Sequence, residues 1–418
     1  MAYITQRRRS VRPSSVRGYS LRRSPVKVRT RPPHPLARLK YSRILFLIAL
    51  LLTVNWTMGA ILKLLFPPAK PQPQTHNIAI SAPVSESDKT VVYNIKTPPN
   101  LIPSKDLQIM VDGAVDIAKI QGLPTESLSI TLIDVSKAAS HTIAGYNNTK
   151  LRFPASVAKL FWMVAFFGYA EKGYIAKESP FYTDLSQMLR ISDNDSASRV
   201  VDAITQTESG ENLDKTELEK WVEKRSQVNQ FFEKSGYSGI NLTTKNYPIT
   251  GIGEEPTGRD LQLRENPPYS KGNLVTTDQT ARLMYEIYTK QAISPLASTK
   301  MAYLLTRDLN PKAWKNIDSN SVEGFLGESL PPDIYYGSKV GYTSRSRQEI
   351  AFVRTLNDKA IYILAVFGDD PAYAKNEEVF PKISRYIFDR LNQTPLKSTP
   401  EKVSQLNSLS FPMVGLNH

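Results

Sequence analysis

The sequence predicts an α/β protein of the α+β kind, in which an antiparallel sheet is flanked by helices and preceded by a transmembrane helix. Two alternating apolar segments lie early in the folded region and three lie near its end, with most of the helical sequence between them. A run of 19 uncharged, mostly apolar residues precedes this region. We therefore expect one sheet assembled from both ends of a single folded domain.

Residues 1–43 form a strongly basic tail. They hold 13 Lys and Arg residues and no Asp or Glu, whereas the formal net charge of the whole chain is +14. Subtracting the tail leaves about +1 for the rest, so the positive charge does not belong to a folded DNA-binding surface. We predict a disordered cytoplasmic tail whose arginines set membrane topology and bind no nucleic acid; nucleic-acid binding by the tail is the weaker alternative.

The apolar run falls within residues 44–66, which we predict to be a transmembrane anchor. The run is long enough to span a bilayer as one helix, whereas the apolar core of a secretory signal is usually only about 7 to 15 residues. By the positive-inside rule, this is a single-pass protein of the cytoplasmic or inner membrane, with its N-terminus cytoplasmic and its C-terminal domain extracytoplasmic (periplasmic). Residues 67–100 are rich in Pro, Ser and Asn, which predicts a linker.

The folded domain is expected over residues 101–395, followed by a C-terminal tail, 396–418. Ser104 and Thr277 are the predicted N-caps of two of its helices. The region 205–270 is polar and carries no clear pattern. In chain order, the other expected elements are a helix in 104–122, strands in 128–135 and 140–147, a helix from Ser156, helical sequence over 184–204, a helix in 276–293, three antiparallel strands within 334–344, 348–357 and 359–370, and a closing helix in 371–393.

Residue types limit the available chemistry. The sequence has no cysteine and only four histidines, at positions 34, 76, 141 and 418. A metal site built on these side chains is therefore not expected, nor is a cofactor. A Ser-His-Asp triad is not expected either, unless His141 serves it alone.

Ser156 and Lys159 stand three residues apart at the start of an apolar helix. Positions i and i+3 share one helix face, so the hydroxyl and the amine can touch. A serine needs a base before it is a good nucleophile, and burial can lower the pKa of a lysine until its neutral amine is accessible near pH 7. The alternative is that Ser156 caps the helix and Lys159 reaches the surface.

Three short motifs occur in order: Ser156-Val157-Ala158-Lys159, Ser192-Asp193-Asn194 and Lys339-Val340-Gly341. This pattern resembles the serine penicillin-recognising enzymes, namely class A β-lactamases and penicillin-binding DD-peptidases, which carry S-x-x-K, S-D-N and K-T-G. The resemblance covers roughly residues 101–392. It implies a β-lactamase/DD-peptidase-like fold, with an all-helical lobe beside the sheet and the active site between them. Taken alone, Ser192-Asp193-Asn194 could instead be a turn that caps a helix.

The resemblance also implies roles. Ser156 is the nucleophile, Lys159 its base and Lys339 a second cation. Ser192 passes protons, and Asn194 holds the lysine and the substrate amide. The backbone N–H groups of Ser156 and Tyr342 would form the oxyanion hole, and Gly341, Tyr342 and Arg347 would contact substrate.

The sequence departs from this family at several points. The spacing from Ser156 to Ser192 is short for a class A enzyme, which suggests a trimmed helical lobe. Val340 replaces a Thr or Ser whose hydroxyl would meet a substrate carboxylate, so Arg347 is the candidate counterion; its alternative is an exposed turn arginine. No E-x-x-L-N motif occurs between Ser192 and Lys339, although class A β-lactamases use that glutamate to activate the deacylating water. Glu254, Glu255 and Glu265 lie in the region without that context.

The sequence thus predicts a membrane-anchored serine hydrolase, acylated at Ser156 by a β-lactam or a D-Ala-D-Ala peptidoglycan stem peptide, with slow hydrolysis of the acyl-enzyme. The alternative from another class is a non-catalytic penicillin- or muropeptide-binding sensor that keeps the pocket and has lost turnover.

Overall fold

The computed structural model describes residues 91–138, 140–175, 179–318 and 320–393, which lie in one compact unit. The predicted basic tail, the transmembrane segment 44–66 and most of the predicted linker lie outside these residues. Across the described ranges, no helix is both long and apolar enough to cross a bilayer.

Within the described ranges, six strands form one sheet in the order β1-β3-β2-β6-β5-β4. The antiparallel pairing of β2 with β6 joins the early strands to the late ones, which confirms a sheet assembled from both ends of the domain. The expected all-antiparallel sheet is wrong in one detail, because β1 pairs with β3 in parallel. The strands are β1 (Ile102–Pro103), β2 (Leu128–Asp134), β3 (Thr142–Tyr146), β4 (Tyr335–Thr343), β5 (Ser346–Arg354) and β6 (Ile361–Gly368).

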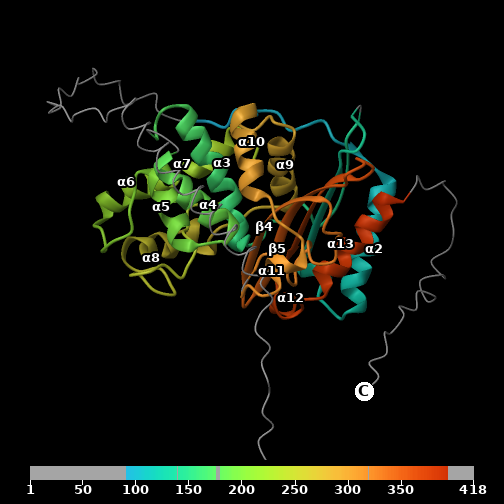
Figure 1. Ribbon diagram of the computed structural model, residues 1–418. Helices are drawn as coiled ribbons and strands as arrows, with labels where there is room; N and C mark the ends of the chain where they lie inside the picture. The colour runs from blue at the N-terminus through green and yellow to red at the C-terminus, as the bar shows by residue number, and fades with distance from the viewer. Residues whose placement is uncertain (1–90, 139, 176–178, 319, 394–418) are drawn as a thin grey trace, which may run out of the picture. The chain divides into compact units, whose positions relative to one another are not determined.

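The helices fall into two groups (Figure 1). Helices α3 to α8 gather to one side as a helical lobe, whereas α2 and α13 lie together against the sheet. The α-helices are α2 (Lys105–Ile120), α3 (Ala158–Glu171), α4 (Tyr182–Arg190), α5 (Asn194–Thr205), α6 (Lys215–Arg225), α7 (Gln227–Glu233), α8 (Gly258–Glu265), α9 (Thr277–Tyr288), α10 (Pro295–Leu305), α11 (Pro311–Trp314), α12 (Pro371–Lys375) and α13 (Val379–Asn392). The 3₁₀ turns are η2 (Thr125–Ser127), η3 (Ala155–Val157), η4 (Ser179–Phe181) and η5 (Tyr269–Lys271).

Two apolar clusters hold these layers together. One joins α3, α9 and the helical lobe to the sheet, and the other joins the opposite face of the sheet to α2 and α13. Helix α3 is buried on every side from Ala158 to Tyr169, as expected for a helix that is apolar all round. This confirms the predicted core helix and fixes the segment that carries Ser156 and Lys159.

Four boundary predictions need correction. Val91 and Tyr93 are buried in the core, so the folded domain begins within the segment predicted as linker. The helical sequence over 184–204 is interrupted at Ser192, whose positive φ of 61° ends one helix before the next begins. Helix α9 is capped by Thr276 rather than Thr277. The closing helix is divided into α12 and α13.

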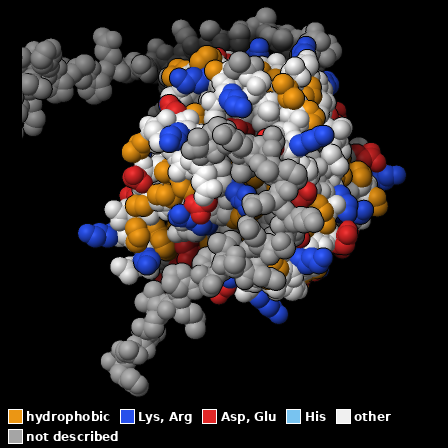
Figure 2. Space-filling view, turned by 90° about the vertical axis from the view of Figure 1, so that its right-hand side faces the viewer, with side chains coloured by type: hydrophobic (Ala, Val, Ile, Leu, Met, Phe, Trp, Pro, Cys, Tyr) orange, Lys and Arg blue, Asp and Glu red, His pale blue; other side chains and the backbone are white. Residues whose placement is uncertain are grey.

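Charge is mixed on one face of the folded domain. On the face shown in Figure 2, basic and acidic side chains are interspersed wherever the described atoms are visible. This agrees with the near-neutral balance calculated for the part of the sequence that follows the basic tail.

Candidate active site

Ser156 lies in the turn η3, immediately before α3. The preceding residue, Ala155, has a positive φ of 46°, an unusual conformation for a residue with a side chain. Strand β4 packs directly against this turn: a Cβ atom on Gly341 would lie 2.6 Å from the carbonyl oxygen of Pro154 and 3.0 Å from the nitrogen of Ser156. Glycine is therefore required at position 341 for the strand to approach the turn.

Lys159 lies one helical turn further on and is fully buried. Its Nζ donates to the carbonyl oxygen of Ser192 at 2.5 Å and to Oδ1 of Asn194 at 2.7 Å. Burial lowers the pKa of Lys159 to about 7, against an opposing effect of the Asp193 carboxylate. A neutral amine has two N–H groups, which can donate to these two oxygens, and its lone pair can take a proton.

The hydroxyl of Ser192 bridges two lysines. Its Oγ accepts a hydrogen bond from Lys339 Nζ at 2.9 Å and lies 3.3 Å from Lys159 Nζ. Burial, and then the nearby charge of Lys159, hold the pKa of Lys339 well below its usual value. The structure thus brings together Lys159, Ser192, Asn194 and Lys339, the groups that the motifs predicted.

Strand β4 is an edge strand, and its outer side carries the predicted oxyanion donor. The carbonyl oxygens of Tyr336 and Ser338 accept hydrogen bonds from Arg307, which lies outside the sheet. Backbone groups repeat their direction every second residue, so those of Val340 and Tyr342 face the same open edge. The N–H of Tyr342 is thereby directed out of the sheet, next to the Gly341 position that touches Ser156.

The expected contact between Ser156 and Lys159 is not formed. Among the described residues, the hydrogen-bond partner of Ser156 Oγ is Asn246, whose Nδ2 donates to it at 3.3 Å and to the carbonyl oxygen of Ala155 at 3.3 Å. The 3₁₀ turn replaces regular helix at Ser156, and the Lys159 amine is held by Ser192 and Asn194. Hydrogen bonds between catalytic groups are often long before substrate binds.

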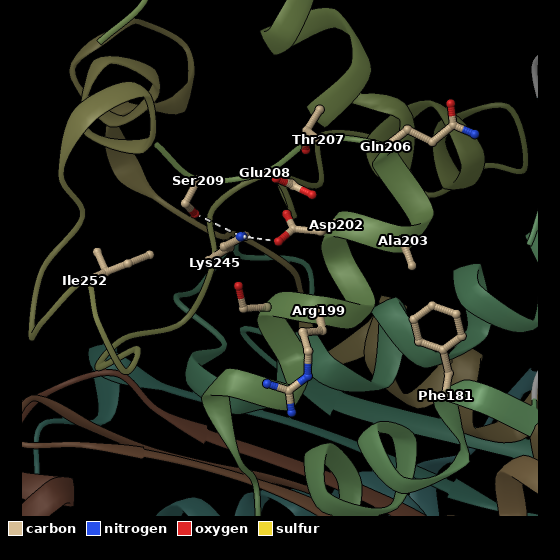
Figure 3. Close-up of a pocket in the computed structure, with 11 residues that line it drawn as sticks. Phe181, Arg199, Asp202, Ala203, Gln206, Thr207, Glu208, Ser209, Lys245 and Ile252 are labelled. Carbon is tan, nitrogen blue, oxygen red and sulfur yellow. Dashed lines mark hydrogen bonds and ion pairs between the residues drawn. The ribbon is translucent and has the colours of Figure 1, made fainter. Parts of the chain in front are cut away.

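Asn246 is the site residue that the sequence analysis missed. It lies in the polar region 205–270, where no motif marks it, and a long-range contact brings it to the site. Its neighbour Lys245 donates to Asp202 at 2.7 Å and to Ser209 Oγ at 2.9 Å (Figure 3). The backbone N–H of Thr250 donates to Asp195 at 2.7 Å. The loop is thus held on α5, the helix that begins with Asn194.

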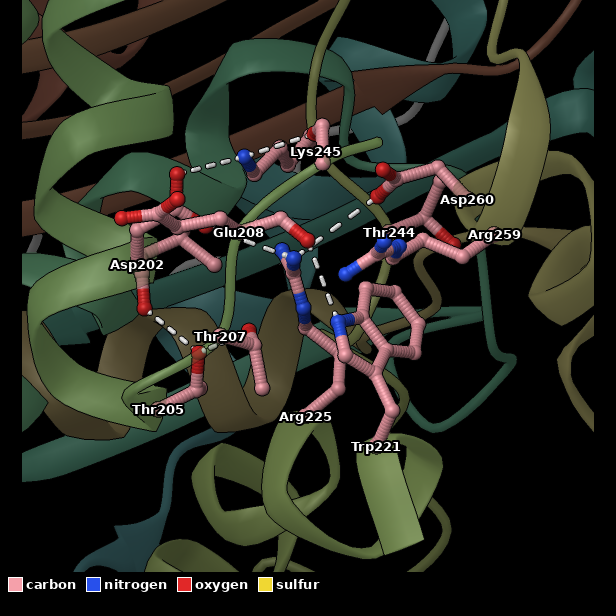
Figure 4. A network of polar contacts seen from close by, with 12 residues as sticks. Asp202, Thr205, Thr207, Glu208, Trp221, Arg225, Thr244, Lys245, Arg259 and Asp260 are labelled. Atoms are coloured by element: carbon pink, nitrogen blue, oxygen red, sulfur yellow. Dashed lines mark hydrogen bonds and ion pairs between the residues drawn. The ribbon is translucent and has the colours of Figure 1, made fainter. Parts of the chain in front are cut away.

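A buried ionic cluster packs against the loop that carries Lys245 and Asn246. Arg225 is fully buried, with its Nη2 3.3 Å from Asp202 and 3.8 Å from Asp260, and with its guanidinium over the ring of Trp221 (Figure 4). Burial lowers the pKa of Arg225, while both carboxylates oppose that effect. An adjacent cavity of about 710 Å³ is lined by Asp202 and Lys245 but not by Ser156 or Lys159, so we assign the cluster to the scaffold.

The structure does not place Arg347 with the predicted catalytic residues. It lies in β5 opposite Tyr342, and only 2% of it is exposed. Its guanidinium donates to the carbonyl oxygens of Gly324, Tyr373 and Ala374. The prediction of an available counterion is therefore wrong for this conformation, and so is its alternative of an exposed turn arginine.

No carboxylate lies in hydrogen-bonding distance of Ser156 among the described residues. Glu254, Glu255 and Glu265 are all exposed, and Glu255 pairs with Arg264 at 2.9 Å. The described ranges also contain no group of three or more His, Asp and Glu side chains that could hold a metal ion.

Comparison with known proteins identifies the family of this chain. The model of the β-lactamase enzyme family matches residues 117–391, which include all three motifs. This chain belongs to the β-lactamase enzyme family. None of the curated proteins compared with this β-lactamase-family chain matches it significantly.

Solved structures similar to this β-lactamase-family protein are distant in sequence. The β-lactamase from Sphaerobacter thermophilus is 18% identical, with a TM-score of 0.47 over 69% of this chain and 98% of that chain. A structure of PBP-A is 15% identical, with a TM-score of 0.47 over 70% and 98%. An engineered ancestral class A β-lactamase of Gram-negative bacteria is 14% identical, with a TM-score of 0.45 over 67% and 97%.

Proposed function

We propose that this protein is a membrane-anchored serine hydrolase that forms an acyl-enzyme through Ser156 with a β-lactam or a D-Ala-D-Ala peptidoglycan stem peptide. One observation carries the proposal: a serine hydroxyl, that of Ser192, joins two buried lysines with lowered pKa values beside the turn of Ser156. Perturbed titratable groups gathered in this way are typical of acid–base catalysis.

Acylation follows from this arrangement. Ser156 Oγ attacks the substrate carbonyl carbon while its proton passes to the neutral amine of Lys159. The negative oxygen that develops is stabilised by the N–H groups of Ser156 and Tyr342. When the C–N bond breaks, the leaving nitrogen takes a proton from the hydroxyl of Ser192, which is replaced by a proton from Lys159 through the same hydrogen-bond network.

Deacylation has weaker support. Water must attack the ester and lose a proton, and Asn246, the polar side chain that contacts Ser156 Oγ, has an amide that cannot accept this proton. This favours a long-lived acyl-enzyme. The same observation supports the second candidate, a penicillin- or muropeptide-binding sensor in which the bound group is not released.

The deciding experiment uses the full chain in detergent, labelled with a fluorescent penicillin and followed by mass spectrometry over time. We expect one covalent adduct, located on Ser156 and absent from Ser156→Ala. Ser344→Ala, which changes an exposed serine on the β4–β5 turn, is the matched control and should label normally. Release of the adduct over time indicates a hydrolase, whereas an indefinitely stable adduct indicates a sensor. A labelled Ser156→Ala protein would contradict both candidates.

The membrane topology can be tested separately, because the sequence has no cysteine and accepts a single reporter thiol. We expect a membrane-impermeant maleimide to label Asn357→Cys, on an exposed turn of the folded domain, in intact spheroplasts. Ser10→Cys should be labelled only after lysis. The reverse pattern, or labelling of both variants before lysis, would contradict the proposed anchor orientation.

A further inference from the structure

Tyr342 covers Arg347 at the end of β4. The Arg347 guanidinium contacts two aromatic rings, with its centre 4.9 Å from the ring centroid of Phe325 and 5.0 Å from that of Tyr342. Arg347 is 2% exposed, whereas Tyr342 is 54% exposed. The ring of Tyr342 is therefore presented to solvent, and the cation beneath it is not.

The site of Arg347 is formed specifically for a guanidinium. Nη1 donates to Gly324 at 2.8 Å, Nη2 to Ala374 at 3.1 Å and Nε to Tyr373 at 3.3 Å. Gly324 has a φ of +70°, which favours glycine, and a Cβ atom there would lie 2.6 Å from Nη1. Tyr373 and Ala374 belong to the short helix α12, whose carbonyl groups favour a cation. The exposed carboxylate of Glu377 lies 3.5 Å from Nη2.

Tyr342 also lies beside the reacting atoms. It follows Gly341, which touches the turn of Ser156, and its own N–H faces the open edge of β4. A substrate whose carbonyl oxygen reaches this N–H must place its next group near the Tyr342 side chain. The neighbouring side chains there are the exposed ring of Tyr342 and the buried Val340, and Arg347, which contacts that ring, is only 2% exposed.

We propose that Tyr342 determines the specificity of this site by covering Arg347, so that binding does not require a carboxylate on the substrate and uncharged acyl compounds react as well as their acids. This inference rests on the proposed acylation of Ser156. The alternative hypothesis is that Arg347 only holds α12 in place. In that case, substrate choice would not depend on Tyr342.

The test compares benzylpenicillin with its methyl ester. Second-order acylation rate constants are measured on the full chain for the wild type, Tyr342→Phe and Tyr342→Ala. Tyr303→Ala is the matched control, because Tyr303 is 59% exposed and its ring also lies 5.0 Å from an arginine, Arg190. The readout is the acid-to-ester ratio of each variant relative to wild type, in which the intrinsic reactivities of the two compounds cancel.

We expect Tyr342→Ala to raise the acid-to-ester ratio on the order of tenfold, because a newly exposed guanidinium forms a charge-assisted hydrogen bond with the carboxylate. The gain should shrink at high salt. Tyr342→Phe keeps the ring and should retain the wild-type ratio, as should Tyr303→Ala. Adding Arg347→Met to Tyr342→Ala should abolish the gain.

An unchanged acid-to-ester ratio in Tyr342→Ala would overturn the inference. The inference would also fail if the wild type prefers the acid and Arg345→Ala, on the exposed β4–β5 turn, removes that preference. Both outcomes leave the proposed function intact, because they require acylation to occur. If neither compound acylates Ser156 in any variant, the proposed function itself has failed.

Discussion

The side-chain amide of Asn246 donates to the hydroxyl oxygen of Ser156 at 3.3 Å, although 90 positions separate the two residues in the chain. The same nitrogen also donates to the carbonyl oxygen of Ala155, the residue with positive φ. One amide thus holds both the nucleophile and the turn that presents it. Asn246 is therefore placed to orient Ser156 before attack, and it can stabilise negative charge that develops on Oγ.

Asn246→Ala should slow acylation on the order of tenfold, which corresponds to the loss of one hydrogen bond of about 1.4 kcal/mol. The measurement is the acylation rate with a fluorescent penicillin. The control is Asn357→Ala, which removes an exposed asparagine from the turn between β5 and β6. It should react like wild type. An Asn246→Ala protein that acylates at the wild-type rate would show that the contact is incidental.

The sequence predicted the parts of this site that depend on local spacing. Ser156 lies in the turn η3 and Lys159 in the helix that follows it, and Ser192 and Asn194 flank one helix start, so short motifs were sufficient to find them. Asn246 reaches the site through a loop that packs across the domain, and no periodicity reports such a contact. Tyr342 and Arg347 face each other in the β4–β5 hairpin, but the burial of Arg347 depends on carbonyl groups of Gly324 and α12, which are distant in sequence. The sheet was predicted because β2, β5 and β6 have clear patterns, whereas the two-residue β1 has none.

Acylation should depend on the protonation of Lys159. Its pKa is lowered to about 7, so the amine is neutral above that pH and protonated below it. The acylation rate should therefore rise with pH through about 7 and fall about tenfold for each pH unit below it. Lys159→Arg keeps the charge but cannot lose its proton in this range, so it should lose acylation by about 100- to 10,000-fold.

The control for this prediction is Lys150→Arg, because Lys150 is an exposed lysine paired with Glu126 at the surface. It should retain both the rate and the pH profile of wild type. Near-normal acylation by Lys159→Arg would mean that Lys159 supplies only charge, and another group would have to be the base.

The ionic cluster beneath the Asn246 loop should matter for stability. Asp202 accepts from Lys245 at 2.7 Å and from Arg225 at 3.3 Å, and both of these cations are buried. Asp202→Asn leaves two buried cations short of a counterion, so we expect a loss on the order of 3 kcal/mol in the free energy of unfolding. Glu255→Gln, in an exposed pair, should cost less than about 1 kcal/mol. Denaturant titration of both variants checks this difference, and equal stability would contradict the role of the cluster.

The acyl-enzyme should be long-lived. Acylation has its groups in place at Ser156, Lys159, Ser192 and Lys339, but deacylation needs a base for water, and Asn246 has an amide where it contacts Ser156. A positioned general base contributes typically 100- to 10,000-fold, which is about 3 to 5 kcal/mol of barrier. We therefore expect acyl-enzyme lifetimes at least two decades longer than those of an efficient β-lactamase, measured by chasing labelled protein with unlabelled penicillin.

Rapid turnover of nitrocefin, on the order of tens per second, would contradict this prediction and would mean that a carboxylate moves into the site when substrate binds. The candidates are Glu254 and Glu255, on an exposed loop, and Glu265, at the exposed end of α8. We expect only the glutamine variant of the true base to accumulate the acyl-enzyme while acylating at the wild-type rate. Neutralising that carboxylate removes the activation of water, which follows acylation.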